Sequence, residues 1–114
     1  MKMYAIKNCD TVKKARNWLE NNGVDYEFHD YKKDGVDEAK LREFIAKFGW
    51  ESVLNMKGMT WRKMSDTEKA AITDEASAIA LMLEKPSIIK RPIIDAGSEA
   101  LIGFKEEEYQ QLAG

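Results

Sequence analysis

The first third of the chain alternates between apolar and polar positions in a way that predicts a strand, a helix and a second strand. Residues 3–6 form an uninterrupted apolar run, which is typical of a short buried strand. Apolar residues then recur at helical spacing, with lysine and arginine between them: Val12, Ala15, Trp18 and Leu19. Residues 24–28 alternate between apolar and polar side chains, and Tyr31 can extend this second strand. Strand, helix and strand in this order predict parallel strands with a right-handed crossover.

Residues 36–85 are predicted to form a mostly helical block, after a turn at residues 32–35. It contains a helix over 37–48, a further turn over 50–54, a loop over 55–63, a short helix from Ser65 through Ile72 and one more short helix after it. The last of these is predicted to bury one face, made of Ala76, Ile79, Ala80 and Leu83.

Residues that favour helix termini mark where these helices begin and end. The predicted caps are Asp10 or Thr11, then Asp37, Ser65 with Glu68 as a capping box, and Thr73 or Asp74, while Gly23 and Gly49 are predicted stops.

The last part of the chain predicts a hairpin and a helix. Pro86 ends the helical block, and apolar residues on both sides of Gly97 predict two antiparallel strands, one within 88–95 and one over 100–103. Residues 105–112 form a helix with glutamates in its first turn, where negative charge is favourable. The predicted order is therefore βαβ, a helical insertion and ββα, which is an α/β (α+β) fold.

The amino-acid composition of the chain excludes several classes of function. The chain has 114 residues, 44% apolar and 33% charged, with a net charge of −2, which suits one soluble domain and gives no reason to expect nucleic acid as a partner. One cysteine and one histidine allow no disulfide framework and leave too few ligands for a zinc site. We expect no bound metal or cofactor, no membrane association, a cytoplasmic location and a monomer. The single histidine, His29, falls on the polar phase of its strand and is interpreted as structural.

Cys9 lies where the first predicted strand gives way to the first helix. Unpaired N–H groups at a helix start stabilise a thiolate, and Lys7, Lys13 and Lys14 add positive charge nearby. A lone cysteine is also often a small buried hydrophobe without chemistry. Both interpretations stay open at this point.

Four stretches of the sequence resemble the arsenate reductase (ArsC)/Spx family, and in particular its YffB-type branch of small proteins. They are YAIKNCDTVKKA at 4–15, FHDY at 28–31, TWRK at 60–63 and IKRPII at 89–94. The resemblance covers essentially the whole chain. It implies one ArsC/Spx-like domain over 1–114, with a thioredoxin-like core (1–31 and 86–114), a mixed four-stranded sheet and a helical insert over 36–85.

The resemblance also implies roles for single residues. Cys9 falls on the family's nucleophilic cysteine, Arg91 on an arginine that faces it, and Pro92 on a proline that is cis in thioredoxin-like folds. Lys57 lies where the reductases carry a second arginine. Their third arginine would fall near residues 101–103, where nothing is cationic.

Further candidates for binding substrate or glutathione are Lys7, Asn8, Lys57, Arg62 and Pro92, with Cys9 and Arg91 as the catalytic pair. A peptide with two carboxylates, such as glutathione, suits several separated cations. Spx-type regulators carry a Cys-x-x-Cys switch, but position 12 here is valine, so no internal disulfide can form.

Three functions follow from this resemblance. The leading expectation is a thiol oxidoreductase in which Cys9 forms mixed disulfides, with glutathione as co-substrate and glutaredoxin as a further partner. The second is arsenate reduction coupled to glutathione and glutaredoxin. The third is a non-catalytic protein that binds RNA polymerase, as Spx-type relatives do.

Overall fold

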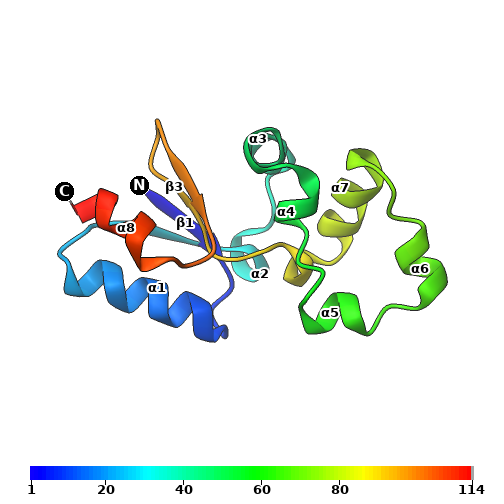
Figure 1. Ribbon diagram of the computed structural model, residues 1–114, viewed down its shortest axis with the longest axis horizontal. Helices are drawn as coiled ribbons and strands as arrows, with labels where there is room; N and C mark the ends of the chain where they lie inside the picture. The colour runs from blue at the N-terminus through cyan, green and yellow to red at the C-terminus, as the bar shows by residue number, and fades with distance from the viewer. Residues whose placement is uncertain (114) are drawn as a thin grey trace. The chain divides into compact units, whose positions relative to one another are not determined.

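The computed structural model describes residues 1–113 and divides the chain into two units (Figure 1). The first unit joins Met1–Asp34 to the C-terminal part of the chain from Arg91, and the second is Gly35–Lys90. The elements of the first unit are β1 (Lys2–Ala5), α1 (Asp10–Asn21), β2 (Glu27–Asp30), α2 (Tyr31–Asp34), β3 (Ile93–Asp95), β4 (Ala100–Ile102) and α8 (Glu106–Ala113).

The four strands form one mixed sheet in the order β2-β1-β3-β4. β1 is parallel to β2 and antiparallel to β3, and β3 and β4 form an antiparallel hairpin. The predicted α/β fold with a mixed four-stranded sheet is therefore confirmed.

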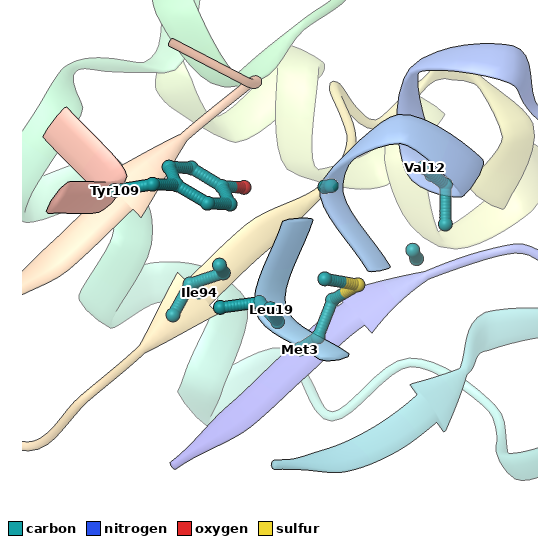
Figure 2. Close-up of a cluster of buried hydrophobic side chains, with 7 residues drawn as sticks. Met3, Val12, Leu19, Ile94 and Tyr109 are labelled. Atoms are coloured by element: carbon teal, nitrogen blue, oxygen red, sulfur yellow. The ribbon is translucent and has the colours of Figure 1, made fainter. Parts of the chain in front are cut away.

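The core of the first unit lies between the sheet and its two longer helices. Met3, Leu19, Ile94 and Tyr109 are fully buried and come from β1, α1, β3 and α8, as Figure 2 shows. The hydroxyl of Tyr109 donates a hydrogen bond to the Gly103 carbonyl oxygen (2.9 Å), so this large side chain is buried without an unsatisfied polar group. Burial also raises the pKa of Tyr109.

The second unit is helical. Its elements are α3 (Glu38–Phe48), α4 (Trp50–Val53), α5 (Met59–Arg62), α6 (Asp66–Ala70), α7 (Glu75–Glu84) and the 3-10 helix η1 (Pro86–Ile88). Three predicted caps are present. Asp37 accepts hydrogen bonds at the start of α3, and capping boxes open α6 (Ser65 with Glu68) and α7 (Asp74 with Ser77).

Replacing Asp74 with alanine is expected to lower the thermal midpoint at pH 7, because Oδ1 of Asp74 accepts the Ser77 N–H (2.9 Å) and closes the first turn of α7. The hydrogen bonds from Ser77 hold the pKa of the Asp74 carboxyl below its ordinary value. Stabilisation by this carboxylate is therefore present above the unfolded-state pKa of about 3.9 and is lost as pH falls through the lower folded-state pKa. Thermal melts of wild type and variant from pH 7 downwards check this. Asp74→Asn is the control, since it keeps a capping oxygen but cannot titrate. A stability difference for the alanine variant that stays constant into strong acid would contradict the prediction.

Three local predictions are wrong in the first unit. β2 begins at Glu27, so residues 24–26 lie outside the strand, and Tyr31 starts the short helix α2 instead of extending β2. The predicted turn at 32–35 is thus mostly helical. Side chains explain the change of direction, because Oδ1 of Asp30 accepts the Lys32 N–H (3.0 Å) and Oδ2 of Asp34 accepts the Asp30 N–H (3.1 Å).

The second unit corrects three further predictions. Residues 59–62 are the helix α5 inside what was predicted as a loop, and α6 ends at Ala70, short of Ile72. In α7 the buried residues are Ala78, Ile79, Leu81 and Met82, whereas three of the four predicted ones are exposed (Ala76, Ala80 and Leu83).

Residues 86–90, which the sequence groups with the thioredoxin-like core, make their backbone contacts in the second unit. The Asn55 N–H donates to the Ile88 carbonyl (2.8 Å) and the Lys90 N–H to the Val53 carbonyl (2.7 Å). Within residues 1–113 there is no helix with the length and apolar character to cross a membrane.

Candidate active site

Cys9 is the N-cap residue of α1, four residues after the carboxyl end of β1. Its backbone is extended (φ −142°, ψ 126°), its carbonyl accepts the Lys13 N–H (3.0 Å), and its own N–H donates to the Lys7 carbonyl (3.0 Å). The predicted caps Asp10 and Thr11 are wrong, because both already lie within the helix. No side chain caps α1, so the first-turn N–H groups have no side-chain acceptor from its N-cap.

The Cys9 side chain is half-buried and packs against the core beneath α1. This position agrees with part of each interpretation left open by the sequence: the body of the side chain contacts hydrocarbon, and the residue still has access to solvent. Lys7, Lys13 and Lys14 are all exposed, and Asp10 adds one negative charge in the same turn. Cations therefore outnumber anions around the thiol.

Arg91 and Pro92 lie at the same end of the sheet as Cys9, where β1 ends and β3 begins. β3 pairs with β1 through Lys2–Asp95, Met3–Ile94 and Tyr4–Ile93. The ladder ends at Tyr4–Ile93, so the Arg91–Pro92 segment enters β3 at the end of the sheet where β1 leads out towards Cys9.

The local structure fixes this short segment. The Arg91–Pro92 peptide bond is cis, Pro92 is buried, and its carbonyl accepts the Gly103 N–H (2.8 Å) from the end of β4. Arg91 is half-buried, with its Nε atom inside the protein. Five of the seven candidates from the sequence belong to the first unit: Lys7, Asn8, Cys9, Arg91 and Pro92.

Lys57 and Arg62 belong to the second unit, and both are exposed. Lys57 lies in a tight turn in which its N–H donates to Oδ1 of Asn55 (3.2 Å). A Cβ atom at Gly58 would come within 2.7 Å of Nδ2 of Asn55, so a larger residue at 58 would require the Asn55 side chain to shift. Arg62 ends α5. Both remain candidates on the strength of the resemblance.

Two other positions bear on the chemistry. Residues 101–103 are Leu, Ile and Gly, so β4 carries no cation at its end. His29 is half-buried instead of lying on an open polar face, and its ring contacts those of Tyr4 (4.9 Å between centroids) and Tyr31 (5.7 Å). His29 therefore packs within an aromatic cluster on β1, β2 and α2.

Among residues 1–113, His, Cys, Asp and Glu side chains form no cluster of three or more that could hold a metal ion. A cavity of about 360 Å³ in the first unit lies at the other end of α1 from Cys9. Its wall includes Arg16, whose guanidinium donates to the Tyr26 hydroxyl (2.9 Å) and stacks on the Phe28 ring (4.2 Å). No local pattern could predict this cluster, because Arg16 lies on α1, Phe28 on β2 and Tyr26 in the segment between them.

Comparison with known proteins identifies the family. The ArsC family matches residues 4–112. An uncharacterized protein of Haemophilus influenzae is 44% identical over 108 residues, which cover 95% of this chain and 94% of that protein. The global transcriptional regulator Spx of Streptococcus pyogenes is 28% identical over 93% of this chain and 79% of its own length.

Solved structures of similar proteins agree with this family assignment. A YffB protein superimposes with a TM-score of 0.93 at 49% identity, covering 99% of this chain and 98% of that one. An arsenate reductase (ArsC) related protein from Brucella melitensis has a TM-score of 0.77 at 46% identity, covering 96% and 91%. With a nucleophile candidate at the start of α1, a cis proline before β3 and these relatives, the chain belongs to the ArsC family.

Proposed function

We propose that this protein is a cytoplasmic thiol oxidoreductase that uses Cys9 as its only nucleophile and glutathione as co-substrate. The observation that carries the proposal is the position of Cys9. It is half-buried at the start of α1, which no side chain caps, and it lies at the end of the sheet where the cis Arg91–Pro92 bond leads into β3. A half-buried thiol keeps access to solvent, and a helix start is a favourable place for charge that develops during the reaction.

The proposed reaction is thiol–disulfide exchange in two steps. The Cys9 thiolate attacks one sulfur of a disulfide, such as oxidised glutathione, so that a mixed disulfide forms on Cys9 and a thiolate leaves. A second, external thiolate then attacks the mixed disulfide, releases Cys9 as a thiolate and leaves as part of a new disulfide. The external thiol is required because the chain contains no second cysteine.

The cations have separate roles in this proposal. Arg91 offers a planar, two-point contact to a carboxylate or to a developing thiolate. Lys7 and Asn8, in the same unit as Cys9, supply further contacts for a substrate carboxylate. The cytoplasm is the compartment in which a lone thiol stays reduced.

Incubation with oxidised glutathione followed by intact-protein and peptide mass spectrometry tests the first step. We expect one glutathione adduct, on the peptide that contains Cys9, and its removal by a small excess of free thiol. Failure to form an adduct under conditions that modify an unfolded control of the same chain would contradict the proposal.

Replacing Arg91 with alanine is expected to slow adduct formation at pH 7 by about 10- to 100-fold, since one charge-assisted contact to the reacting group contributes about 1.5–3 kcal/mol. Arg91→Lys should recover part of the rate, because it keeps the charge but loses the planar fork. Lys90→Ala is the matched control, as it removes the neighbouring exposed cation and should leave the rate within about twofold. Stopped-flow or quenched mass-spectrometric rates measure all three. Equal rates for Arg91→Ala and Lys90→Ala would rule out a role for the guanidinium.

Arsenate reduction receives less support. In the resemblance, three arginines surround the oxyanion, but here only Arg91 is an arginine, Lys57 replaces the second and no cation lies at residues 101–103. Arsenate-dependent consumption of glutathione at a rate above the disulfide reaction would overturn this preference.

The Spx relatives favour a second candidate, a protein that binds RNA polymerase without catalysis. Its support is the 28% identity to a transcriptional regulator over 93% of this chain. A pull-down with purified RNA polymerase separates the two functions. Capture that is equal for wild type and Cys9→Ser supports docking, and no capture removes this candidate.

A further inference from the structure

Asn22 and Gly23 form the only Asn–Gly step of the chain, and both residues are exposed where α1 ends. Asparagine loses its side-chain amide most readily before glycine, because glycine has no Cβ to shield its backbone nitrogen. In this reaction the Gly23 nitrogen attacks Cγ of Asn22, a succinimide ring forms, and Nδ2 leaves as ammonia with the proton of the Gly23 N–H. Water then opens the ring at either carbonyl, which gives aspartate, or isoaspartate with the backbone running through the former side chain.

The folded turn is not arranged for this ring closure. Nδ2 of Asn22 donates a hydrogen bond to the Trp18 carbonyl (2.8 Å), and the backbone ψ of Asn22 is 9°. A five-membered ring requires Cβ of Asn22 and the Gly23 nitrogen to be nearly eclipsed about the Cα–C bond, and this ψ value keeps them apart. The ring therefore closes only when the last turn of α1 opens.

The last turn of α1 is weakly held. The Asn22 N–H is shared between the carbonyls of Trp18 (3.1 Å) and Leu19 (3.3 Å), and the Gly23 N–H reaches the Glu20 carbonyl only at 3.3 Å. No basic residue lies in this turn, and the Glu20 carboxylate adds negative charge at the negative end of the helix dipole. Long hydrogen bonds at an exposed helix end open readily, so the reactive arrangement is accessible from the folded protein.

We propose that Asn22 is a deamidation site, that its amide is lost from the opened last turn of α1, and that both products keep this turn loose. Aspartate at position 22 no longer donates to the Trp18 carbonyl, and it places a second carboxylate in the turn that already contains Glu20. This modification uses no residue of the Cys9 site.

Isoaspartate acts through the backbone. It adds one carbon atom to the main chain before Gly23, whereas the Val24 N–H now donates to the Leu19 carbonyl (2.9 Å) and closes the end of the helix. Val24 is half-buried and packs against the core of the first unit. The longer main chain moves the Val24 N–H from its acceptor and loosens this packing.

The site is tested by ageing the full-length protein at mildly alkaline pH and mapping its peptides by mass spectrometry, with chromatography to separate aspartate from isoaspartate. We expect modification at Asn22, with isoaspartate as the more abundant product. Asn17 is the internal control, since it is exposed on the same helix but precedes tryptophan. Asn22→Gln keeps an amide but would need a slower six-membered ring, so it should stay unmodified. Equal modification of Asn17 and Asn22, or none at Asn22, would overturn the proposal.

The requirement for opening is tested against a synthetic peptide of residues 16–27, which has no folded turn to protect it. Asn22 should react at least about tenfold more slowly in the folded protein than in this peptide. Glu20→Lys places a cation at the end of α1 and should slow the reaction of the folded protein about threefold, while changing that of the peptide by less than about twofold. Equal rates for protein and peptide, or equal effects of Glu20→Lys on both, would show that the turn does not control the reaction.

The consequence for the helix is tested with Asn22→Asp, which reproduces one product in every molecule. It should lower the thermal midpoint by about 4 °C, since it removes a hydrogen bond and adds an unfavourable charge. Asn21→Asp is the matched control, because it adds the same charge one residue earlier and keeps the Asn22–Trp18 hydrogen bond. Its effect should be no more than about half as large. Equal shifts in the two variants, or no shift in Asn22→Asp, would contradict loosening by the modified residue.

Discussion

Replacing Cys9 with serine is expected to reduce both adduct formation and disulfide-exchange turnover to background, a loss of at least about a thousandfold. The hydroxyl of serine is a far weaker acid than a thiol and has no activating base here, so it cannot attack a disulfide at neutral pH. No other residue can substitute, because the chain holds a single cysteine. Measurement of glutathione adducts by mass spectrometry and of turnover in a coupled assay checks both parts.

The control for this substitution must show that the fold survives. Cys9 is half-buried and makes no side-chain cap to α1, so serine should leave the thermal midpoint nearly unchanged. Residual turnover in Cys9→Ser, with no adduct elsewhere on the chain, would contradict a mechanism through this sulfur. Capture of RNA polymerase by the same variant bears only on the docking function.

Replacing Leu19 with alanine is expected to destabilise the protein by about 3 kcal/mol, which changes the unfolding equilibrium by more than a hundredfold. Leu19 lies on the inner face of α1 and is fully buried, in one cluster with Met3, Ile94 and Tyr109 (Figure 2). Its truncation removes buried apolar surface and leaves a cavity that the surrounding strands fill only in part. Chemical denaturation monitored by tryptophan fluorescence and by circular dichroism gives the free energy of unfolding.

Asn17→Ala is the matched control for this change, because Asn17 is exposed on the same helix, two residues earlier. It should alter the free energy of unfolding by no more than about 0.5 kcal/mol. A loss of less than about 1 kcal/mol in Leu19→Ala would mean that α1 is not held by this cluster. In that case the orientation of Cys9 at the other end of the helix would need another explanation.

Local patterns predicted the elements whose determinants lie close together in the sequence. The caps at Asp37, Ser65 and Asp74 form between residues two or three apart, and they occur as predicted. The hairpin of β3 and β4 also follows from a glycine between two apolar runs. The local pattern does not predict that β3 pairs with β1 in the antiparallel direction; only the tertiary structure shows this pairing.

Predictions that required tertiary context were less successful. Tyr31 follows directly after the alternating residues and was predicted to extend the strand, but hydrogen bonds among Asp30, Lys32 and Asp34 turn the backbone into α2. In α7 almost every residue is apolar, so periodicity could not tell the covered side from the open one. The candidate site shows the same limit. Cys9 is close in sequence to Lys7, Lys13 and Lys14, but only the antiparallel pairing of β1 and β3 puts Arg91 at the same end of the sheet.

The hydrogen bond between Asp34 and Asp30 also affects how the sheet ends. β2 is an edge strand. The Glu27 N–H donates to the Met1 carbonyl, on the side of the sheet. Because N–H groups alternate in direction along a strand, the Asp30 N–H, three residues later, points away from the sheet. Its capture by the Asp34 carboxylate means that the edge offers one donor fewer to a strand from another molecule. This single contact therefore helps to protect the protein from edge-to-edge aggregation at high concentration.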